Sequence, residues 1–103
     1  MDGFGGTFEW DAAKAEANVA KHRISFEPAA KVFDDPNIVL MKDRIDETGE
    51  QRWNAIGNVE GVVLLLVTHV YRGRENDEEI IRIISARRAD SRERRFYLQG
   101  AAE

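Results

Sequence analysis

Residues 62–67 are apolar at every position, and this run restricts the possible folds more than any other feature of the chain. A half-buried strand alternates apolar and polar residues, whereas a strand that is covered on both faces is apolar throughout. The run is also far shorter than the ~20 residues that a membrane-spanning helix needs. We therefore expect it to belong to a strand near the centre of a sheet.

The flanking patterns predict an α+β fold with the element order β-α-α-β-β-β-β-α. Because hairpin connections join most of the strands and the helices are grouped near the two ends, we expect an antiparallel sheet with the helices packed against one face. The expected strands cover residues 7–10, 37–42, 51–56, 62–70 and 80–86, with a polar loop over 72–79 and helices that begin near residues 12, 26 and 91.

Capping residues set the expected helix boundaries. Asp11 is a good N-cap for the first helix, which is expected over residues 12–22. Pro36 follows the second helix and helps to stop it. A capping box over Asp90–Glu93 opens the third helix, and Gly100 is expected to end it.

Length and composition indicate a single folded domain. The chain has 103 residues, of which 43% are hydrophobic and 33% are charged, which suffices for a core without cross-links. Residues 1–6 are rich in glycine and are expected to form a flexible N-terminus that lacks the features of a signal peptide. The absence of cysteine excludes disulfides and thiolate zinc sites, and it fits a reducing compartment. We therefore expect a cytoplasmic protein.

The net charge of −4 argues against a nucleic-acid partner, but the charges are distributed unevenly. Residues 34–50 contain six acids, whereas residues 80–98 contain six arginines. A globally acidic protein with one basic face can still bind RNA, while its acidic side suits a basic partner protein. Ordinary solvated faces explain the same segregation equally well.

Four polar side chains share one stripe of the first expected helix. Lys14, Asn18, Lys21 and His22 combine two cations, an amide and the one side-chain type that titrates near neutrality without perturbation. Such a stripe suits metal-free RNA cleavage, because RNA supplies its own 2′-hydroxyl nucleophile and the protein adds a base, an acid and cations. The alternative is structural, since positive charge at a helix C-terminus interacts favourably with the helix dipole.

Two arginines of the last expected strand are further candidates for phosphate binding. Arg82 and Arg87 have opposite parity along the strand, so both face one site only if the strand ends or bulges before Arg87. An ion pair of Arg82 with Glu9 or Asp11 is an equal alternative. Trp10 is a candidate for stacking on RNA bases, although a place in the core is the more common role of tryptophan.

The sequence contains few metal-binding patterns. His22 and His69 are the only histidines, and they do not form the H-x-x-x-H pair of a zinc helix. The acidic segment 43–50 lacks the alternation of a calcium loop. We therefore expect no metal and no other cofactor.

Two dense motifs resemble the BrnT-type toxins of bacterial type II toxin–antitoxin systems. The first reads F-E-W-D-x-x-K-x-x-x-N-x-x-K-H over residues 8–22, and the second reads R-I-I-S-A-R-x-A over residues 82–89, followed by E-R-x-x-Y. The resemblance covers residues 8–97 and implies a ribonuclease toxin domain with a RelE-like fold. It also implies an RNA substrate and a cognate BrnA-like antitoxin, typically a ribbon-helix-helix protein, through which the complex binds operator DNA.

The stripe, the arginines and the resemblance together predict a metal-independent endoribonuclease site. Proton transfer or phosphate contact is expected from the helix, and stabilisation of the transition state from the arginines. The expected catalytic residues are Lys14, His22, Arg52, Arg82 and Arg87, and the expected RNA-binding residues are Trp10, Asn18, Lys21 and Arg23.

Arg23 departs from the family pattern, which usually has glycine after the Lys-His pair. Helices commonly end in a residue with positive φ, which glycine adopts most easily. Either Arg23 adopts that conformation at some cost, or the helix ends differently and displaces His22, or Arg23 adds a phosphate contact. The altered residue and the net acidity leave a second hypothesis open, a non-catalytic module that binds the antitoxin and modulates operator binding.

Overall fold

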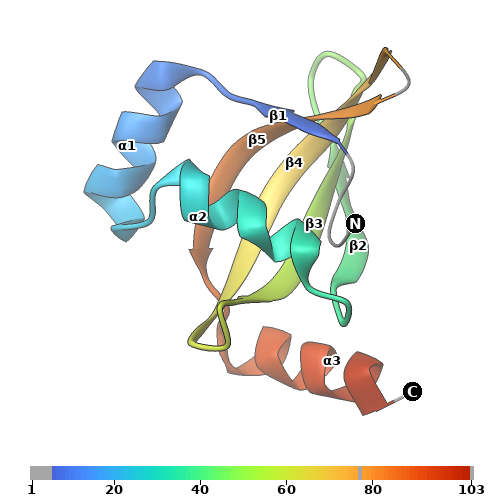
Figure 1. Ribbon diagram of the computed structural model, residues 1–103. Coiled ribbons are helices and arrows are strands. Elements are labelled where there is room, and N and C mark those ends of the chain that lie inside the picture. The colour runs from blue at the N-terminus through green and yellow to red at the C-terminus, as the bar shows by residue number, and fades with distance from the viewer. Residues whose placement is uncertain (1–5, 77, 103) are drawn as a thin grey trace.

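The chain forms one sheet with helices on both of its faces (Figure 1). The computed structural model describes residues 6–76 and 78–102. Of the expected flexible segment, residues 1–5 lie outside this described part. The elements are β1 (Thr7–Glu9), α1 (Ala12–His22), α2 (Phe26–Ala30), the 3-10 helix η1 (Lys31–Asp34), β2 (Val39–Ile45), β3 (Gln51–Val59), β4 (Val63–Glu75), β5 (Glu78–Arg88) and α3 (Ser91–Ala102).

The expected α+β class and element order are confirmed, and the apolar run lies where it was predicted. The strand order is β1-β5-β4-β3-β2, so β4 is the central strand. Leu65 and Val67 of β4 are buried in the core beneath α2, whereas Leu64 and Leu66 are buried on the opposite face of the sheet. Burial on both faces explains why polar residues do not interrupt the run within β4, whereas Val62 lies before the strand and is 84% exposed.

The sheet is mixed, so the prediction of a purely antiparallel sheet is wrong. β1 pairs in parallel with β5, with Thr7 opposite Ile80 and Glu9 opposite Arg82, whereas the other strand pairs are antiparallel. β1 and β5 come from distant parts of the sequence, so no hairpin turn fixes their relative direction. Local patterns therefore carry no information about this pairing.

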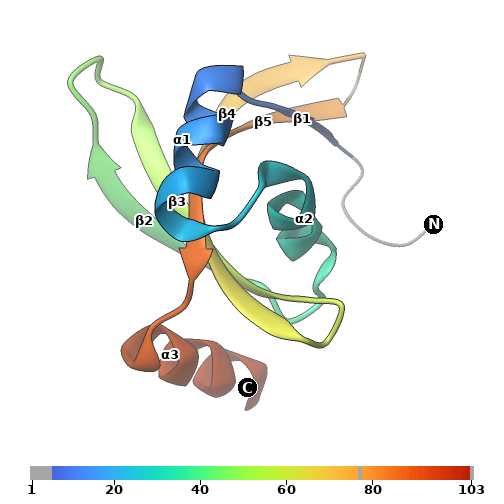
Figure 2. The ribbon, with the colours of Figure 1, turned by 90° about the vertical axis from the view of Figure 1, so that its left-hand side faces the viewer.

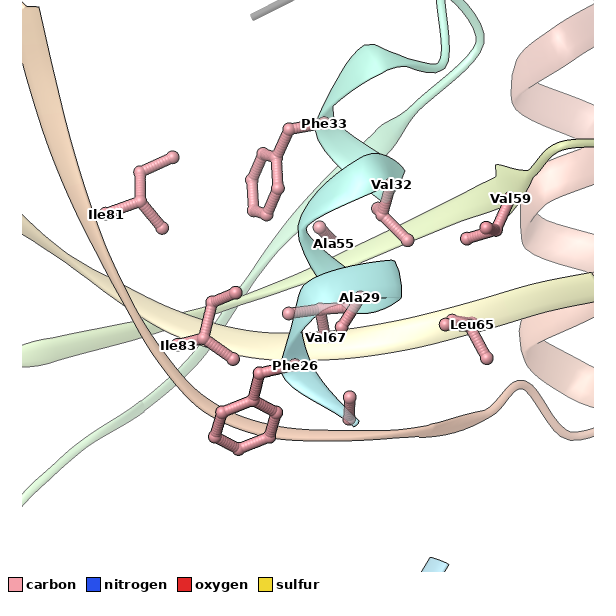
Figure 3. Close-up of a cluster of buried hydrophobic side chains, with 11 residues drawn as sticks. Phe26, Ala29, Val32, Phe33, Ala55, Val59, Leu65, Val67, Ile81 and Ile83 are labelled. Carbon is pink, nitrogen blue, oxygen red and sulfur yellow. The ribbon is translucent and has the colours of Figure 1, made fainter. Parts of the chain in front are cut away.

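The prediction that all helices pack against one face is also wrong. Phe26, Ala29, Val32 and Phe33 of α2 and η1 cover one face and form the main core (Figure 3). α3 lies under one end of the opposite face (Figures 1 and 2), where Tyr97 joins a second buried cluster. The alternate apolar residues of β4 require cover on this face too, and α3 supplies it.

Several element boundaries differ from the sequence prediction, most clearly at the β4–β5 hairpin and at the end of α3. The expected loop over residues 72–79 is instead the end of a long hairpin, because β4 continues to Glu75 and β5 begins at Glu78. Backbone pairing with β5 holds this arm, with Arg74 opposite Glu79 and Glu75 opposite Glu78. α3 continues through Gly100, where a Cβ atom would lie 2.9 Å from Val39 Cγ2, so the missing side chain lets the helix approach β2.

The N-terminal caps of α1 and α3 follow the sequence prediction. The Asp11 carboxylate accepts a hydrogen bond of 3.0 Å from the backbone N–H of Lys14. The expected capping box of α3 is complete, since the Asp90 carboxylate accepts from Glu93 N–H at 2.9 Å and the Glu93 carboxylate accepts from Asp90 N–H at 2.8 Å.

None of the described helices is long and apolar enough to cross a membrane.

His69 of β4 is a fully buried ionisable group in the main core. Its Nδ1 lies 3.2 Å from the carbonyl oxygen of Val67, and its ring packs edge-on against Phe33 with centroids 4.8 Å apart. The Tyr71 hydroxyl is 3.4 Å from Nε2. Burial lowers the pKa of His69 to about 4, against the smaller opposing effect of the Val67 carbonyl.

This histidine should make the fold sensitive to mild acid. The unfolded chain protonates His69 near pH 6.5, but the folded chain protonates it only near pH 4, so stability is complete above pH 6.5 and falls as the pH drops to 4. The loss over this window is about 3 kcal/mol. Urea unfolding between pH 4 and 7 measures it, and His69→Phe should flatten the dependence. Equal slopes in both proteins would contradict the assignment.

Candidate active site

Asn18 fixes α1 against the sheet. It is only 6% exposed, and its Nδ2 donates to the carbonyl oxygens of Ala86 and Ile24, each at 2.8 Å. Its Oδ1 accepts from the backbone N–H of Ala86 at 3.1 Å. Backbone groups already use its amide donors and its acceptor, and its predicted contact with RNA stays a prediction. Asn18 is a positioning residue that sets which face of α1 the solvent meets.

The rest of the α1 stripe lines a surface depression of about 390 Å³, named here the helix-side hollow. Lys14 and Lys21 are exposed, and His22 is partly exposed at the last turn of the helix. Among the described residues that line this hollow, none is acidic. Besides Asn18, the polar and ionisable side chains that line this hollow are Lys14, Lys21 and His22 from α1, Arg52 from β3 and Ser85 from β5.

A β-bulge in β5 brings Arg82 and Arg87 to one face of the sheet. Thr68 pairs with Ser85 and His69 with Ile83, so Ile84 is an extra residue in β5. Arg82 lies opposite Val70 and Arg87 opposite Leu66, and these two positions of β4 are an even number of residues apart. The condition set by the sequence, a bulge before Arg87, is therefore met.

A second depression of about 380 Å³, the turn-side hollow, adjoins the first. The two share Lys14, Arg52 and Ile84. The turn-side hollow differs in charge, because its lining contains acidic side chains from the β2–β3 turn as well as cations. Its further charged residues are Asp46, Glu47, Glu50, Arg72 and Arg82.

Arg52 is placed between the two hollows by its strand and by Asp46. Its Nε lies 3.6 Å from Asp46 Oδ2 and is buried without a hydrogen-bond partner among the described residues. The Thr48 hydroxyl and the backbone N–H groups of Glu50 and Thr48 hydrogen-bond Asp46 and lower its pKa to about 2, and the Arg52 charge adds to this. The ionised turn thus orients Arg52 and leaves a donor of its guanidinium unmatched.

Arg82 forms an ion pair with Glu9, which was one of the alternatives to phosphate binding that the sequence left open. Its Nη1 lies 3.0 Å from Glu9 Oε2, yet the side chain also lines the turn-side hollow. Arg72, which sequence reasoning missed, lies beside it and is 3.3 Å from the Glu50 carboxylate. Gly73 was the available signal, because glycine inside a strand pattern often marks a bulge, and Arg72 is the extra residue of β4 there.

Three expected site residues do not line either hollow. Both terminal nitrogens of Arg87 contact the Glu93 carboxylate at 2.8 Å, and this hydrogen-bonded pair raises the pKa of Arg87 and lowers that of Glu93. Trp10 packs edge-on against Phe26 with ring centroids 5.8 Å apart, as part of the core packing. Arg23 is exposed beyond the end of α1. Arg87 and Trp10 thus make structural contacts outside the two hollows, and their predicted site roles stay predictions.

Arg23 ends α1 in the left-handed conformation, with φ 62° and ψ 27°. Its backbone N–H donates to the carbonyl oxygen of Val19 at 2.9 Å. This is the conformation that glycine adopts without a steric penalty. Of the outcomes considered from the sequence, Arg23 accepts the strained conformation, and His22 keeps its place in the last turn of the helix.

Arg23→Gly should therefore stabilise the fold. Removal of the Cβ atom relieves the left-handed strain, and the greater freedom of glycine in the unfolded chain offsets part of the gain, so the net increase is about 0.5–1 kcal/mol. Chemical denaturation measures the change. Arg23→Ala is the matched control, because it removes the same charge but keeps the Cβ, and an equal gain from alanine would contradict the explanation.

A family of known proteins matches most of this chain. Residues 10–93 match the sequence model of a family described as the ribonuclease toxin BrnT of type II toxin–antitoxin systems. The chain belongs to the BrnT family. All residues that line the two hollows fall inside the matched segment. Family membership identifies the chain as a ribonuclease toxin with an RNA substrate and an antitoxin partner.

A solved structure shares the BrnT fold. The Brucella abortus ribonuclease toxin BrnT superimposes with a TM-score of 0.62, at 24% sequence identity, over 84% of this chain and 99% of that chain. Among curated proteins, no relative is matched. Within the described residues, no three His, Cys, Asp or Glu side chains gather in a group that could hold a metal ion.

Proposed function

We propose that this BrnT-family chain is an endoribonuclease that holds the scissile phosphate in the helix-side hollow and cleaves RNA without a metal ion. One observation carries the proposal: Lys14, Lys21 and His22 of α1 converge with Arg52 of β3 on a hollow whose described lining has no acid. A phosphate is the group that such a set of cations favours.

The proposed reaction needs only side chains of this hollow and the RNA. A base removes the proton of the 2′-hydroxyl, the oxygen attacks the adjacent phosphorus, and the bond to the 5′-oxygen breaks while an acid protonates that oxygen. The products are a 2′,3′-cyclic phosphate and a 5′-hydroxyl. His22 and Lys14 carry the two proton transfers, and Lys21 and Arg52 stabilise the negative charge that builds on the phosphorus oxygens.

The partner side of the proposal follows from the family. We expect a ribbon-helix-helix antitoxin of the BrnA type to neutralise the toxin, and the complex to bind operator DNA through the antitoxin. We expect the toxin domain to span residues 8–97 of a single domain and to act in the cytoplasm. Expression of the chain alone in bacteria should arrest growth, and co-expression of the cognate antitoxin should relieve the arrest.

Cleavage of a defined RNA by the purified protein in the presence of EDTA tests the mechanism. The expected result is a 2′,3′-cyclic phosphate end, with no cleavage of an oligonucleotide that carries 2′-deoxyribose at the scissile position. Loss of cleavage on chelation would reject metal independence. An absence of cleavage together with antitoxin binding would instead support a non-catalytic interaction module.

A further inference from the structure

An anion already lies between two guanidinium groups that line the turn-side hollow. The Glu9 carboxylate is 3.0 Å from Nη1 of Arg82 and 3.8 Å from Nε of Arg72. Glu9 belongs to the three-residue edge strand β1, whereas the two arginines come from the central hairpin. The arginines thus form a site for one anionic oxygen group, which a carboxylate of the same chain occupies.

This occupant can be exchanged. The side chains of Glu9, Arg72 and Arg82 are 41%, 46% and 33% exposed, so water reaches all three. Ion pairs with this exposure contribute only about 0–1 kcal/mol, and a competing anion replaces one partner at little cost. Arg72 keeps a second contact with Glu50 at 3.3 Å, which holds its guanidinium in the hollow when Glu9 leaves.

The two arginines also lie next to the proposed site of the scissile phosphate. Lys14, Arg52 and Ile84 line both hollows, so the hollows adjoin at these residues. The cations of α1 and the arginines that contact Glu9 therefore line neighbouring parts of one surface.

We propose that Arg72 and Arg82 form a second phosphate subsite for RNA, next to the scissile phosphate, which Glu9 fills in the free protein. The inference rests on the proposed function, because it assumes RNA in the neighbouring hollow. A phosphate group suits the site because guanidinium groups bind its oxygens in the same fork geometry as a carboxylate. The nearby acids Glu47 and Glu50 repel further phosphates and limit the subsite to one.

Binding of uncleavable RNA tests the subsite without relying on catalysis. Fully 2′-O-methylated oligonucleotides that differ by one phosphate at either end serve as probes in fluorescence anisotropy. For the wild type, the added phosphate at one end should increase affinity roughly tenfold, the value of one charged contact. Arg72→Ala should remove this increase and reduce the slope of log affinity against log salt by about 0.7.

Two further variants make the result decisive. Glu9→Gln should tighten binding of the longer probe severalfold, because the neutral amide competes less well than the carboxylate for the two arginines. Arg92→Ala removes an exposed arginine of α3 that lines neither hollow and should leave the length effect intact. An undiminished length effect in Arg72→Ala, or weaker binding in Glu9→Gln, would overturn the subsite.

Cleavage of unmodified RNA by the wild type separates this inference from the proposed function. If the wild type produces cyclic phosphate ends but Arg72→Ala keeps the full length effect, the subsite alone is wrong. If the wild type neither binds the probes nor cleaves RNA, the proposed function is wrong and the subsite is overturned with it.

Discussion

A Lys14→Ala, His22→Ala double variant should lose most of its RNA-cleaving activity. Each well-placed proton transfer contributes about 10²- to 10⁴-fold, and residues that act together are not additive, so we expect a loss of about 10³- to 10⁴-fold. Single-turnover cleavage of a defined RNA measures the rate of the chemical step. Both side chains line the helix-side hollow from exposed or partly exposed positions, so the fold should survive the change.

The control for this variant lies on the same helix. Glu16 is exposed on α1 and lines neither hollow, so Glu16→Ala should keep the wild-type rate. Chemical denaturation of the variant separates any loss of stability at the helix end from the loss of activity. A wild-type rate in the double variant would mean that the α1 stripe is a solvated face and that cleavage occurs elsewhere.

Asn18→Ala should cause the largest loss of stability among single changes at the site. The variant leaves the N–H and C=O of Ala86 and the C=O of Ile24 without their partner, and each buried unmatched group costs about 1–3 kcal/mol. Partial rehydration near Ile24 reduces the sum, so we expect a loss of about 3–4 kcal/mol. Equilibrium denaturation in urea measures it.

The helix propensity of alanine excludes one other explanation for a loss of stability in Asn18→Ala. Alanine is the better helix former, so a loss of stability cannot come from the propensity of α1 and must come from the lost hydrogen bonds. Asn18→Asp is the second test, because it keeps the acceptor for Ala86 N–H but loses both donors and buries a charge. A change below 0.5 kcal/mol in both variants, the range of a surface substitution, would contradict the anchoring role.

The elements predicted correctly depend on interactions between near neighbours. α1 spans residues 12–22 as expected, because the Asp11 cap and the helical spacing are local. The capping box of α3 is equally local, since Asp90 and Glu93 are one turn apart. The continuous apolar run of β4 predicted its central place, because only two-sided burial explains such a pattern.

The incorrect predictions of strand direction and of helix placement concern groups that are distant in sequence. The parallel pairing of β1 with β5 and the position of α3 under the second face depend on how distant segments pack. Arg87 faces the same side of the sheet as Arg82, yet Glu93 of the following helix holds it away from the hollows. Arg72 lines the turn-side hollow because the β4–β5 hairpin continues as paired strands beyond the core.

The sequence by itself determined the family, the class of fold, the limits of α1 and the group of cations that α1 carries. Periodicity and capping encode these features, and both depend on residues within one or two turns of each other. The tertiary structure decided which of these side chains share a site. The hydrogen bonds of Asn18 to β5 turn the stripe toward Arg52, and the Ile84 bulge sets the face of Arg87 relative to Arg82. The first effect acts between segments far apart in the chain, and the second depends on how β5 pairs with β4, so spacing along the sequence does not encode either one.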